Sequence, residues 1–152
     1  MTRNRLAAAV VVAFAAFALV ACSSTEDKNA YIDEVNTIQE DALRAVTLTT
    51  AAPPSNRDEM VSQLESATGA LDDAVAQLNE VSVPEEAQVG HDDFVAAVQA
   101  MSDLFSQTAE KAAKADQADL LTIAAELQTQ GTEIGTDIDA AITKINQDIG
   151  AE

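Results

Sequence analysis

The stretch 87–112, AQVGHDDFVAAVQAMSDLFSQTAEKA, decides the fold, because a largely apolar set of side chains returns every three or four residues. The members of this stripe are Ala87, His91, Phe94, Val98, Met101, Phe105, Thr108 and Ala112. That spacing places them on one face of an α-helix and leaves the opposite face to polar and charged residues. The stretch therefore predicts a helix that packs side by side with other helices.

The same spacing recurs in three other segments of the 152-residue chain. One stripe runs from Tyr31 to Thr49, a second from Met60 to Val81, and a third from Leu120 to Ile149. No segment alternates with period two, so strands are not expected. Four helices with short connections predict an all-α fold, an antiparallel up-down-up-down four-helix bundle over residues 30–150. A three-helix arrangement, with the first helix packed loosely, is the alternative.

The breaks before the second and third predicted helices have the residues that begin helices. Pro53–Pro54 end the first segment, because proline cannot continue a helix. Asn56 with Glu59, and Ser82 with Glu85, have the spacing of capping boxes, in which each side chain accepts a bond from the other's backbone N–H. These pairs predict helix starts just after Asn56 and Ser82.

The boundary between the last two predicted helices is the least defined. Asp116 with Asp119 can cap the fourth helix, and Gly150 can end it. The residues 114–118 are good helix formers, however. The sequence leaves open whether two separate helices or one bent helix passes through this region.

Composition limits the class of protein. There are 26 Asp plus Glu against 8 Lys plus Arg, a formal charge of −18, so the surface repels nucleic acid phosphates and no nucleic acid partner is expected. One Cys excludes a disulfide framework, and one His excludes a multi-His metal site. High charge and few aromatics are also typical of disordered chains. The four regular stripes favour a folded bundle instead.

The N-terminus has the three parts of a secretory signal. Met1–Arg5 carries two Arg and no acid, Leu6–Val20 is an unbroken apolar run, and small and polar residues follow. The apolar run has fifteen residues, whereas a transmembrane helix needs about 20. The segment therefore predicts export rather than a permanent membrane span.

The residues Leu19-Val20-Ala21-Cys22 resemble the lipobox of bacterial lipoproteins. The resemblance implies that signal peptidase II cuts between Ala21 and Cys22 and that the Cys22 thiol carries a diacylglyceryl group, with a further acyl chain such as palmitate in many bacteria. Residues 1–21 would then be a cleaved signal peptide, and residues 22–29 the lipidated cysteine with a polar tether. Two acyl chains give stable membrane attachment. An uncleaved anchor, or an ordinary signal with an incidental Cys, is the alternative.

The remainder of the chain is similar to the small, Ala-rich helical lipoproteins of high-GC Gram-positive bacteria. The similarity rests on Tyr31-Ile32-Asp33-Glu34-Val35-Asn36, and on Val83-Pro84-Glu85 followed by His91 and Phe94. It implies a helical bundle on the extracytoplasmic face of the cell membrane. It supplies no activity and no functional residue.

His91 is the one candidate ligand outside the signal segment. It is either a lone ligand or acid–base group, or a histidine packed at the end of the bundle and bonded to a neighbouring loop. A di-metal carboxylate bundle would need Glu-x-x-His, and Gln88 stands where that Glu would be. No metal or cofactor is therefore expected. Adjacent acids such as Asp72-Asp73 and Asp92-Asp93 are expected to lie on the solvated faces.

Gly131 and Gly135 stand one helical turn apart in the fourth predicted helix. Two glycines cost about 1 kcal/mol each within a helix, so a structural reason for them is expected. The first interpretation is close approach of another helix of the bundle. A flexible or kinked point is the alternative.

The motifs of enzymes are missing from the sequence. It has no Gly-x-Ser-x-Gly elbow, no Cys paired with a base and no glycine-rich phosphate loop. The sequence therefore predicts a membrane-anchored lipoprotein whose bundle is not an enzyme and contacts an unidentified protein of the cell envelope, as a scaffold or accessory subunit. A module that binds a small ligand or a divalent cation is the alternative.

Overall fold

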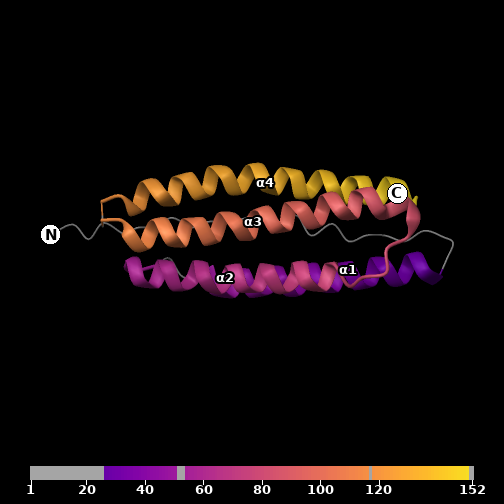
Figure 1. The fold of residues 1–152 in the computed structure, drawn as a ribbon, viewed down its shortest axis with the longest axis horizontal. Helices are drawn as coiled ribbons and strands as arrows, with labels where there is room; N and C mark the ends of the chain where they lie inside the picture. The colour runs from indigo at the N-terminus through magenta and orange to yellow at the C-terminus, as the bar shows by residue number, and fades with distance from the viewer. Residues whose placement is uncertain (1–25, 51–53, 117, 151–152) are drawn as a thin grey trace.

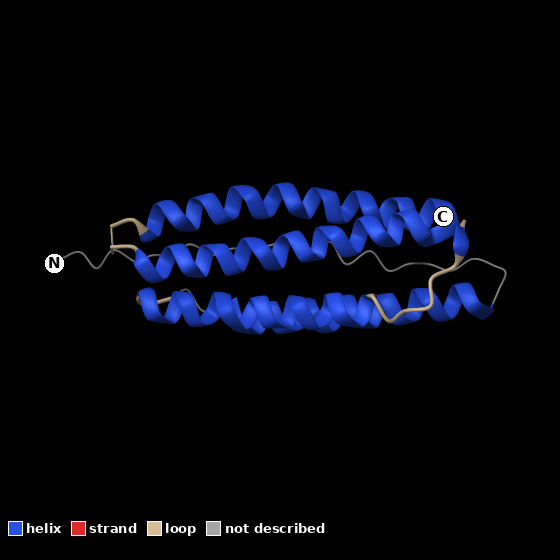
Figure 2. Ribbon diagram, in the orientation of Figure 1, coloured by secondary structure: helices blue, strands red, loops and turns tan. Residues whose placement is uncertain are grey.

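The computed structural model describes residues 26–50, 54–116 and 118–150, and these form four long helices (Figures 1 and 2). They are α1 (Glu26–Thr50), α2 (Arg57–Leu78), α3 (Gln88–Lys114) and α4 (Leu120–Ile149), with a 3₁₀ turn, η1 (Glu85–Ala87), before α3. Within those ranges there is no strand. The chain direction reverses from each helix to the next (Figure 1), so the all-α, antiparallel four-helix bundle is confirmed.

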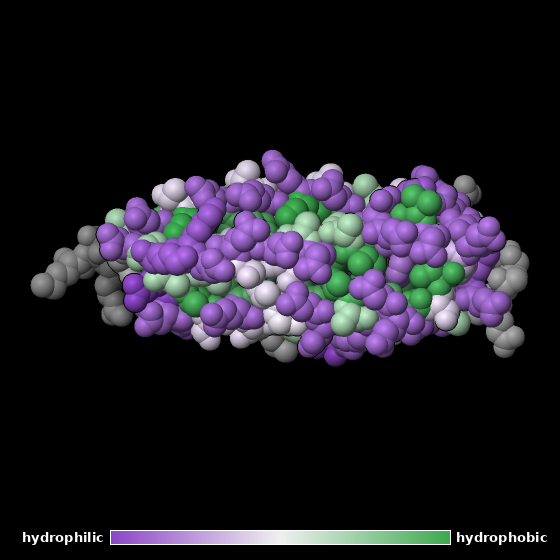
Figure 3. Space-filling view, in the orientation of Figure 1, coloured by the Kyte–Doolittle hydropathy of each residue, from purple (hydrophilic) through white to green (hydrophobic). Residues whose placement is uncertain are grey.

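The helices pack in the order of the sequence. α1 lies along α2, α2 along α3 and α3 along α4, and η1 lies against α4. The result is an elongated rod in which the start of α1 and the end of α4 lie at the same end (Figure 1). The face drawn in Figure 3 is largely hydrophilic, with hydrophobic patches between ridges of polar side chains.

The core consists of the predicted stripes. All eight members of the stripe in 87–112 are buried, and so are all seven of the stripe from Met60 to Val81. Tyr31, Phe94 and Phe105 are among the largest fully buried side chains. Each buried aromatic contributes roughly 1.5–3 kcal/mol by leaving water. In α1, Ala42 is half-buried, and the side chain of Thr49 lies outside the described residues.

The predicted start of α2 is confirmed in its main feature. Asn56 is the N-cap, and its Oδ1 accepts a hydrogen bond from the backbone N–H of Glu59 at 2.9 Å. The reciprocal bond runs from the backbone N–H of Ser55, not of Asn56, to Glu59 Oε2 at 2.7 Å. The break at Pro53 lies outside the described residues.

The predicted start of the third helix at Ser82 is wrong. Pro84 is the residue before η1, with φ −58° and ψ 145°, and α3 itself begins at Gln88. A proline holds the residue before it in extended backbone, so Val83 cannot be helical and Ser82 lies outside the helix. Ser82 is exposed and caps nothing.

The region between α3 and α4 is a true break. Ala115 has extended backbone, with φ −83° and ψ 153°, and this ends α3, so the two helices are not one bent helix. The expected capping by Asp116 and Asp119 is wrong, because Asp119 has φ −83° and ψ −19° and its side chain makes no capping bond. A capping side chain needs an extended backbone at its own residue. Gly150 ends α4 as predicted, with a positive φ of 77°.

The first helix starts earlier than predicted. α1 begins at Glu26, so residues 26–29 are helical rather than part of a tether that precedes a bundle starting at residue 30. Asp27 is in the first turn, where a carboxylate interacts favourably with the helix dipole. The rest of the predicted tether, residues 22–25, lies outside the described residues.

Candidate functional site

His91 lies in the first turns of α3 with 4% of its surface exposed. Its Nδ1 is 3.2 Å from the hydroxyl of Tyr31 on α1, and its Nε2 is 3.1 Å from the carbonyl oxygen of Leu78, the last residue of α2. The Tyr31 and His91 rings meet at an angle of 59°. One imidazole therefore connects three helices at one end of the bundle.

The partners of the imidazole and its burial together favour one protonation state. A carbonyl oxygen can only accept, so Nε2 carries the proton and donates to Leu78. The Tyr31 hydroxyl can donate to Nδ1 when His91 is neutral, and burial favours that neutral form. Burial lowers the pKa of His91, against the opposing effects of the Leu78 carbonyl and the Asp92 carboxylate. Burial also raises the pKa of the Tyr31 hydroxyl, so this group stays protonated.

Neither ring nitrogen of His91 is open to a ligand. This is the packed alternative of the two that the sequence left open, except that the acceptor is the last residue of a helix rather than a loop. The carbonyls of the last turn of a helix lack partners within that helix. His91 gives the Leu78 carbonyl a second donor, beside the N–H of Val81 at 3.3 Å, and so joins α3 to the end of α2.

An ion pair lies at the same end of the bundle. Lys28 Nζ on α1 is 2.8 Å from Glu86 Oε1 in η1, and the Lys28 side chain is 21% exposed. The hydrogen bond from the Lys28 ammonium group holds the pKa of the Glu86 carboxyl below its ordinary value. The backbone N–H of Glu86 and the positive charge of Lys28 lower this pKa further, by smaller amounts. We call the contacts Tyr31–His91, His91–Leu78 and Lys28–Glu86 the end clamp, because they fasten α1 to the turn between α2 and α3.

The glycine that allows close approach is Gly90, not the predicted pair. A Cβ on Gly90 would lie 2.8 Å from Ile145 Cγ1 and 3.0 Å from Ile145 N, so α3 and α4 meet there at a distance that only glycine permits. For Gly131 and Gly135, nothing described lies within 4 Å of such an atom. The first interpretation of those two glycines is therefore wrong. Gly90 was missed because it interrupts no pattern in the sequence.

The acidic residues do not gather into a metal site. In 26–50, 54–116 and 118–150, no three His, Cys, Asp or Glu residues come together as ligands for an ion. Asp73, Asp92 and Asp93 are exposed, as predicted for a solvated surface. Asp72 Oδ1 accepts a hydrogen bond at 2.5 Å from Ser102, so this carboxylate connects α2 to α3.

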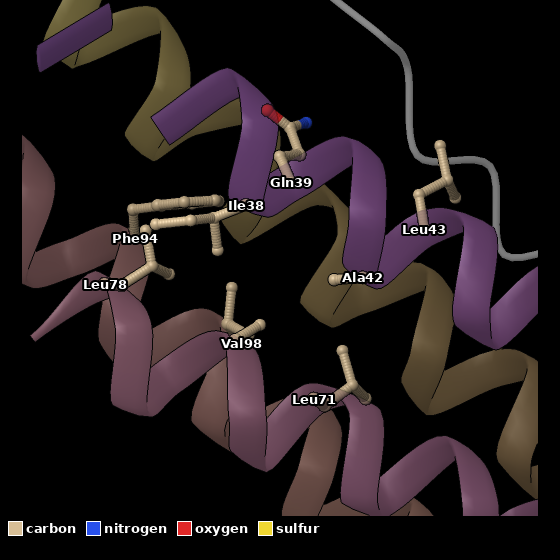
Figure 4. A pocket seen from close by; sticks show the side chains of 9 residues that line it. Ile38, Gln39, Ala42, Leu43, Leu71, Leu78, Phe94 and Val98 are labelled. Atoms are coloured by element: carbon tan, nitrogen blue, oxygen red, sulfur yellow. The ribbon is translucent and has the colours of Figure 1, made fainter. Parts of the chain in front are cut away.

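A small apolar cavity lies between α1, α2 and α3 (Figure 4). Its volume is about 20 Å³, which corresponds to roughly one water molecule. Leu71 and Leu78 of α2 and Phe94 and Val98 of α3 form its inner wall, and Gln39 and Leu43 of α1 stand on the opposite side. The bundle is slightly underfilled here, at a place too small for an organic ligand.

Cys22, the Ala21–Cys22 cleavage position and the signal peptide 1–21 lie outside the described residues. None of the helices in the described ranges combines the length and the apolar character that a membrane span requires. No family model, no curated protein and no solved structure matches this chain.

Proposed function

We propose that the protein is a lipoprotein anchored through Cys22 to the extracytoplasmic face of the cell membrane, where its bundle acts through contact with another protein and not as an enzyme. The observation that carries the proposal is the sequence Leu19–Cys22, which places the only cysteine of the chain directly after an apolar run. The bundle supports the non-enzymatic part of the proposal, since both ring nitrogens of its one histidine have partners within the fold.

The position of α1 supports this proposal. Glu26 begins the helix four residues after Cys22, so the lipid would lie within about 14 Å of the start of α1. The end clamp joins α1 to α2, η1 and α3 in the helical turns that follow, through Lys28 and Tyr31. A load carried by the anchor would therefore reach the whole bundle rather than pull on α1 alone.

The charge balance agrees with a domain that stands away from the lipid. Cleavage before Cys22 would remove Arg3 and Arg5 and no acid, which leaves 6 Lys plus Arg against 26 Asp plus Glu, a charge of −20. Anionic lipids in the leaflet that holds the anchor would repel such a surface. The acyl chains would then hold the protein at the membrane while the bundle stays accessible to partners.

Mass spectrometry of the intact protein from the membrane fraction tests the anchor. We expect a chain that begins at Cys22 and carries the mass of a diacylglyceryl group. The Cys22→Ala variant should lose both the lipid and the membrane attachment. A membrane-bound protein that retains residues 1–21 with an unmodified Cys22 would refute the proposal.

Cross-linking in cells tests the protein contact. The lipidated protein and the Cys22→Ala variant are cross-linked and purified in parallel, and the attached proteins are identified. We expect at least one envelope protein to depend on the anchored form. If no protein is cross-linked to the anchored form beyond those found with the Cys22→Ala variant, the proposed contact role is wrong, although the protein could still be a lipoprotein. Calorimetry with divalent cations and with lipids would then test the alternative, a binding module.

A further inference from the structure

An open groove runs between α3 and α4 on the outside of the bundle. Its volume is about 460 Å³. Its walls are five alanines, Ala96, Ala97 and Ala100 from α3 and Ala140 and Ala141 from α4. Ala97 and Ala141 are buried, but Ala96, Ala100 and Ala140 expose their methyl groups. Walls this low allow another helix to approach closely.

Three charged side chains also line the groove, and they are of both signs. Asp93 and Asp137 contribute carboxylates, and Lys144 contributes the one ammonium group of the lining. Neither aspartate has an ion-pair partner within 4 Å among the residues that the structure describes. Lys144 contacts Asp148 of its own helix at 3.1 Å, in an exposed pair of a kind that contributes little.

The order of these charges along the groove follows from the antiparallel packing. Gly90 of α3 lies against Ile145 of α4, so Asp93 and Lys144 are near the same end of the groove. Asp137 is seven residues before Lys144, which is about 10.5 Å along α4. Lys144 and Asp93 therefore lie at one end of the groove and Asp137 at the other, with the alanine walls between them.

We propose that this groove binds the same groove of a second copy of the chain, with Lys144 of each copy paired to an aspartate of the other. A two-fold axis across the helices, through Ala140 and Ala141, places Lys144 opposite the partner's Asp137. A two-fold axis along the helices places Lys144 opposite the partner's Asp93. Either symmetry forms two identical ion pairs around the alanine walls, as an isologous interface requires.

The mixture of charges favours a second copy over a basic partner. A uniformly basic helix would match Asp93 and Asp137 but would meet Lys144 with repulsion, whereas a second copy offers a carboxylate to Lys144 and an ammonium group to one of the two aspartates. This inference deepens the proposed protein-contact role by naming one partner. It does not depend on the lipid, so its failure would leave the mass-spectrometric test of Cys22 unaffected.

Sedimentation equilibrium of the full chain, purified from membranes in detergent, tests the proposal. The wild type should be a dimer, and Lys144→Glu should weaken the dimer about tenfold or more, as expected for loss of two ion pairs that become repulsive. Lys111→Glu is the matched control, because it changes the net charge equally and lies outside the groove. Its dimer should resemble that of the wild type.

Charge exchange identifies the pairing. Lys144→Asp combined with Asp137→Lys should restore the dimer if the two-fold axis crosses the helices, and Lys144→Asp combined with Asp93→Lys should restore it if the axis runs along them. Circular dichroism confirms that each variant is folded. A monomeric wild type, equal losses in Lys144→Glu and Lys111→Glu, or rescue by neither exchange would each overturn the proposal.

Discussion

At the scale of single residues, His91 shows how one polar side chain can be buried without a large energetic penalty. Both nitrogens have partners, and the Leu78 carbonyl gains a donor at the end of its helix. A buried hydrogen bond contributes about 1 kcal/mol, but a buried polar group without a partner costs about 1–3 kcal/mol. The arrangement therefore depends on all three of Tyr31, Leu78 and His91 remaining in place.

The neutral state of His91 predicts a pH dependence of stability. Burial lowers the pKa of His91 in the folded protein below the ordinary value of 6.5. As the pH falls through about 6.5, the unfolded chain takes up the proton first, so the stability from neutral His91 is complete above that pH and is lost as the pH falls toward the folded pKa. Urea unfolding of the wild type from pH 7 to pH 5 should show a falling free energy of unfolding, by at most about 1.4 kcal/mol per pH unit.

The His91→Leu variant is the control for this pH dependence. It should be less stable at pH 7, because the Tyr31 hydroxyl loses its partner and the Leu78 carbonyl keeps only its bond from the Val81 N–H, but its stability should change less between pH 7 and pH 5. If the free energy of unfolding changes by the same amount in both proteins between pH 7 and pH 5, groups other than His91 cause the pH dependence.

Two glycines within helices should respond in opposite ways to alanine. Gly69 is exposed in α2 with nothing described within 4 Å of an added Cβ, so Gly69→Ala should raise the free energy of unfolding by about 0.5–1 kcal/mol. Gly90→Ala should lower it by about 1–3 kcal/mol, because the new methyl would meet the Ile145 backbone, which cannot move aside alone. Urea denaturation measures both, and a stabilising Gly90→Ala would contradict the close approach of α3 and α4.

At the scale of the helices, the beginnings of α2 and α4 differ in their capping. Asn56 accepts a bond from Glu59 N–H, whereas the Asp119 side chain makes no capping bond. Asn56→Ala should therefore cost about 1 kcal/mol of stability. Asp119→Ala should cost only the smaller contribution of a carboxylate near a helix N-terminus, about 0.3–1 kcal/mol. Thermal unfolding of the two variants compares them directly, and a larger loss for Asp119→Ala would contradict the assignment.

The helices could be predicted from the sequence because the pattern that forms them is local. A stripe such as Phe94, Val98, Met101 and Phe105 fixes both a helix and its buried face, and each member is buried. Local patterns also gave the cap at Asn56 and the end at Gly150. They failed at Ser82, where the restriction imposed by Pro84 outweighs a favourable capping residue.

The contacts between helices could not be predicted in the same way. Tyr31 and His91 are 60 residues apart, and nothing in either segment indicates the other. The sequence identified His91 as unusual but could not choose between a ligand and a packed side chain, because that choice depends on which helices meet at the bundle end. The glycines show the same limit, since the period of a helix does not reveal which glycine another helix approaches.

At the scale of the whole molecule, charge opposes the compact state. The chain has 26 acids against 8 basic residues, so most carboxylates have no basic partner available. The described ion pairs are mostly exposed, as for Lys114–Glu110, and such pairs contribute little. A surface with this excess of one sign repels itself, and folding brings the charges closer together.

This repulsion predicts that salt stabilises the protein. The screening length falls from about 30 Å at 0.01 M to about 10 Å at 0.1 M, so added salt should weaken the many repulsions more than the few attractive pairs, and the melting temperature should rise between these concentrations. A variant with Glu65→Gln and Asp73→Asn removes two exposed acids that have no ion-pair partner among the described residues. It should melt at a higher temperature than the wild type in low salt and should gain less from added sodium chloride, measured by circular dichroism. A melting temperature that falls as salt is added would contradict this prediction. It would mean that attractive ion pairs, such as Lys28–Glu86 in the end clamp, contribute more to stability than repulsion between the acids removes.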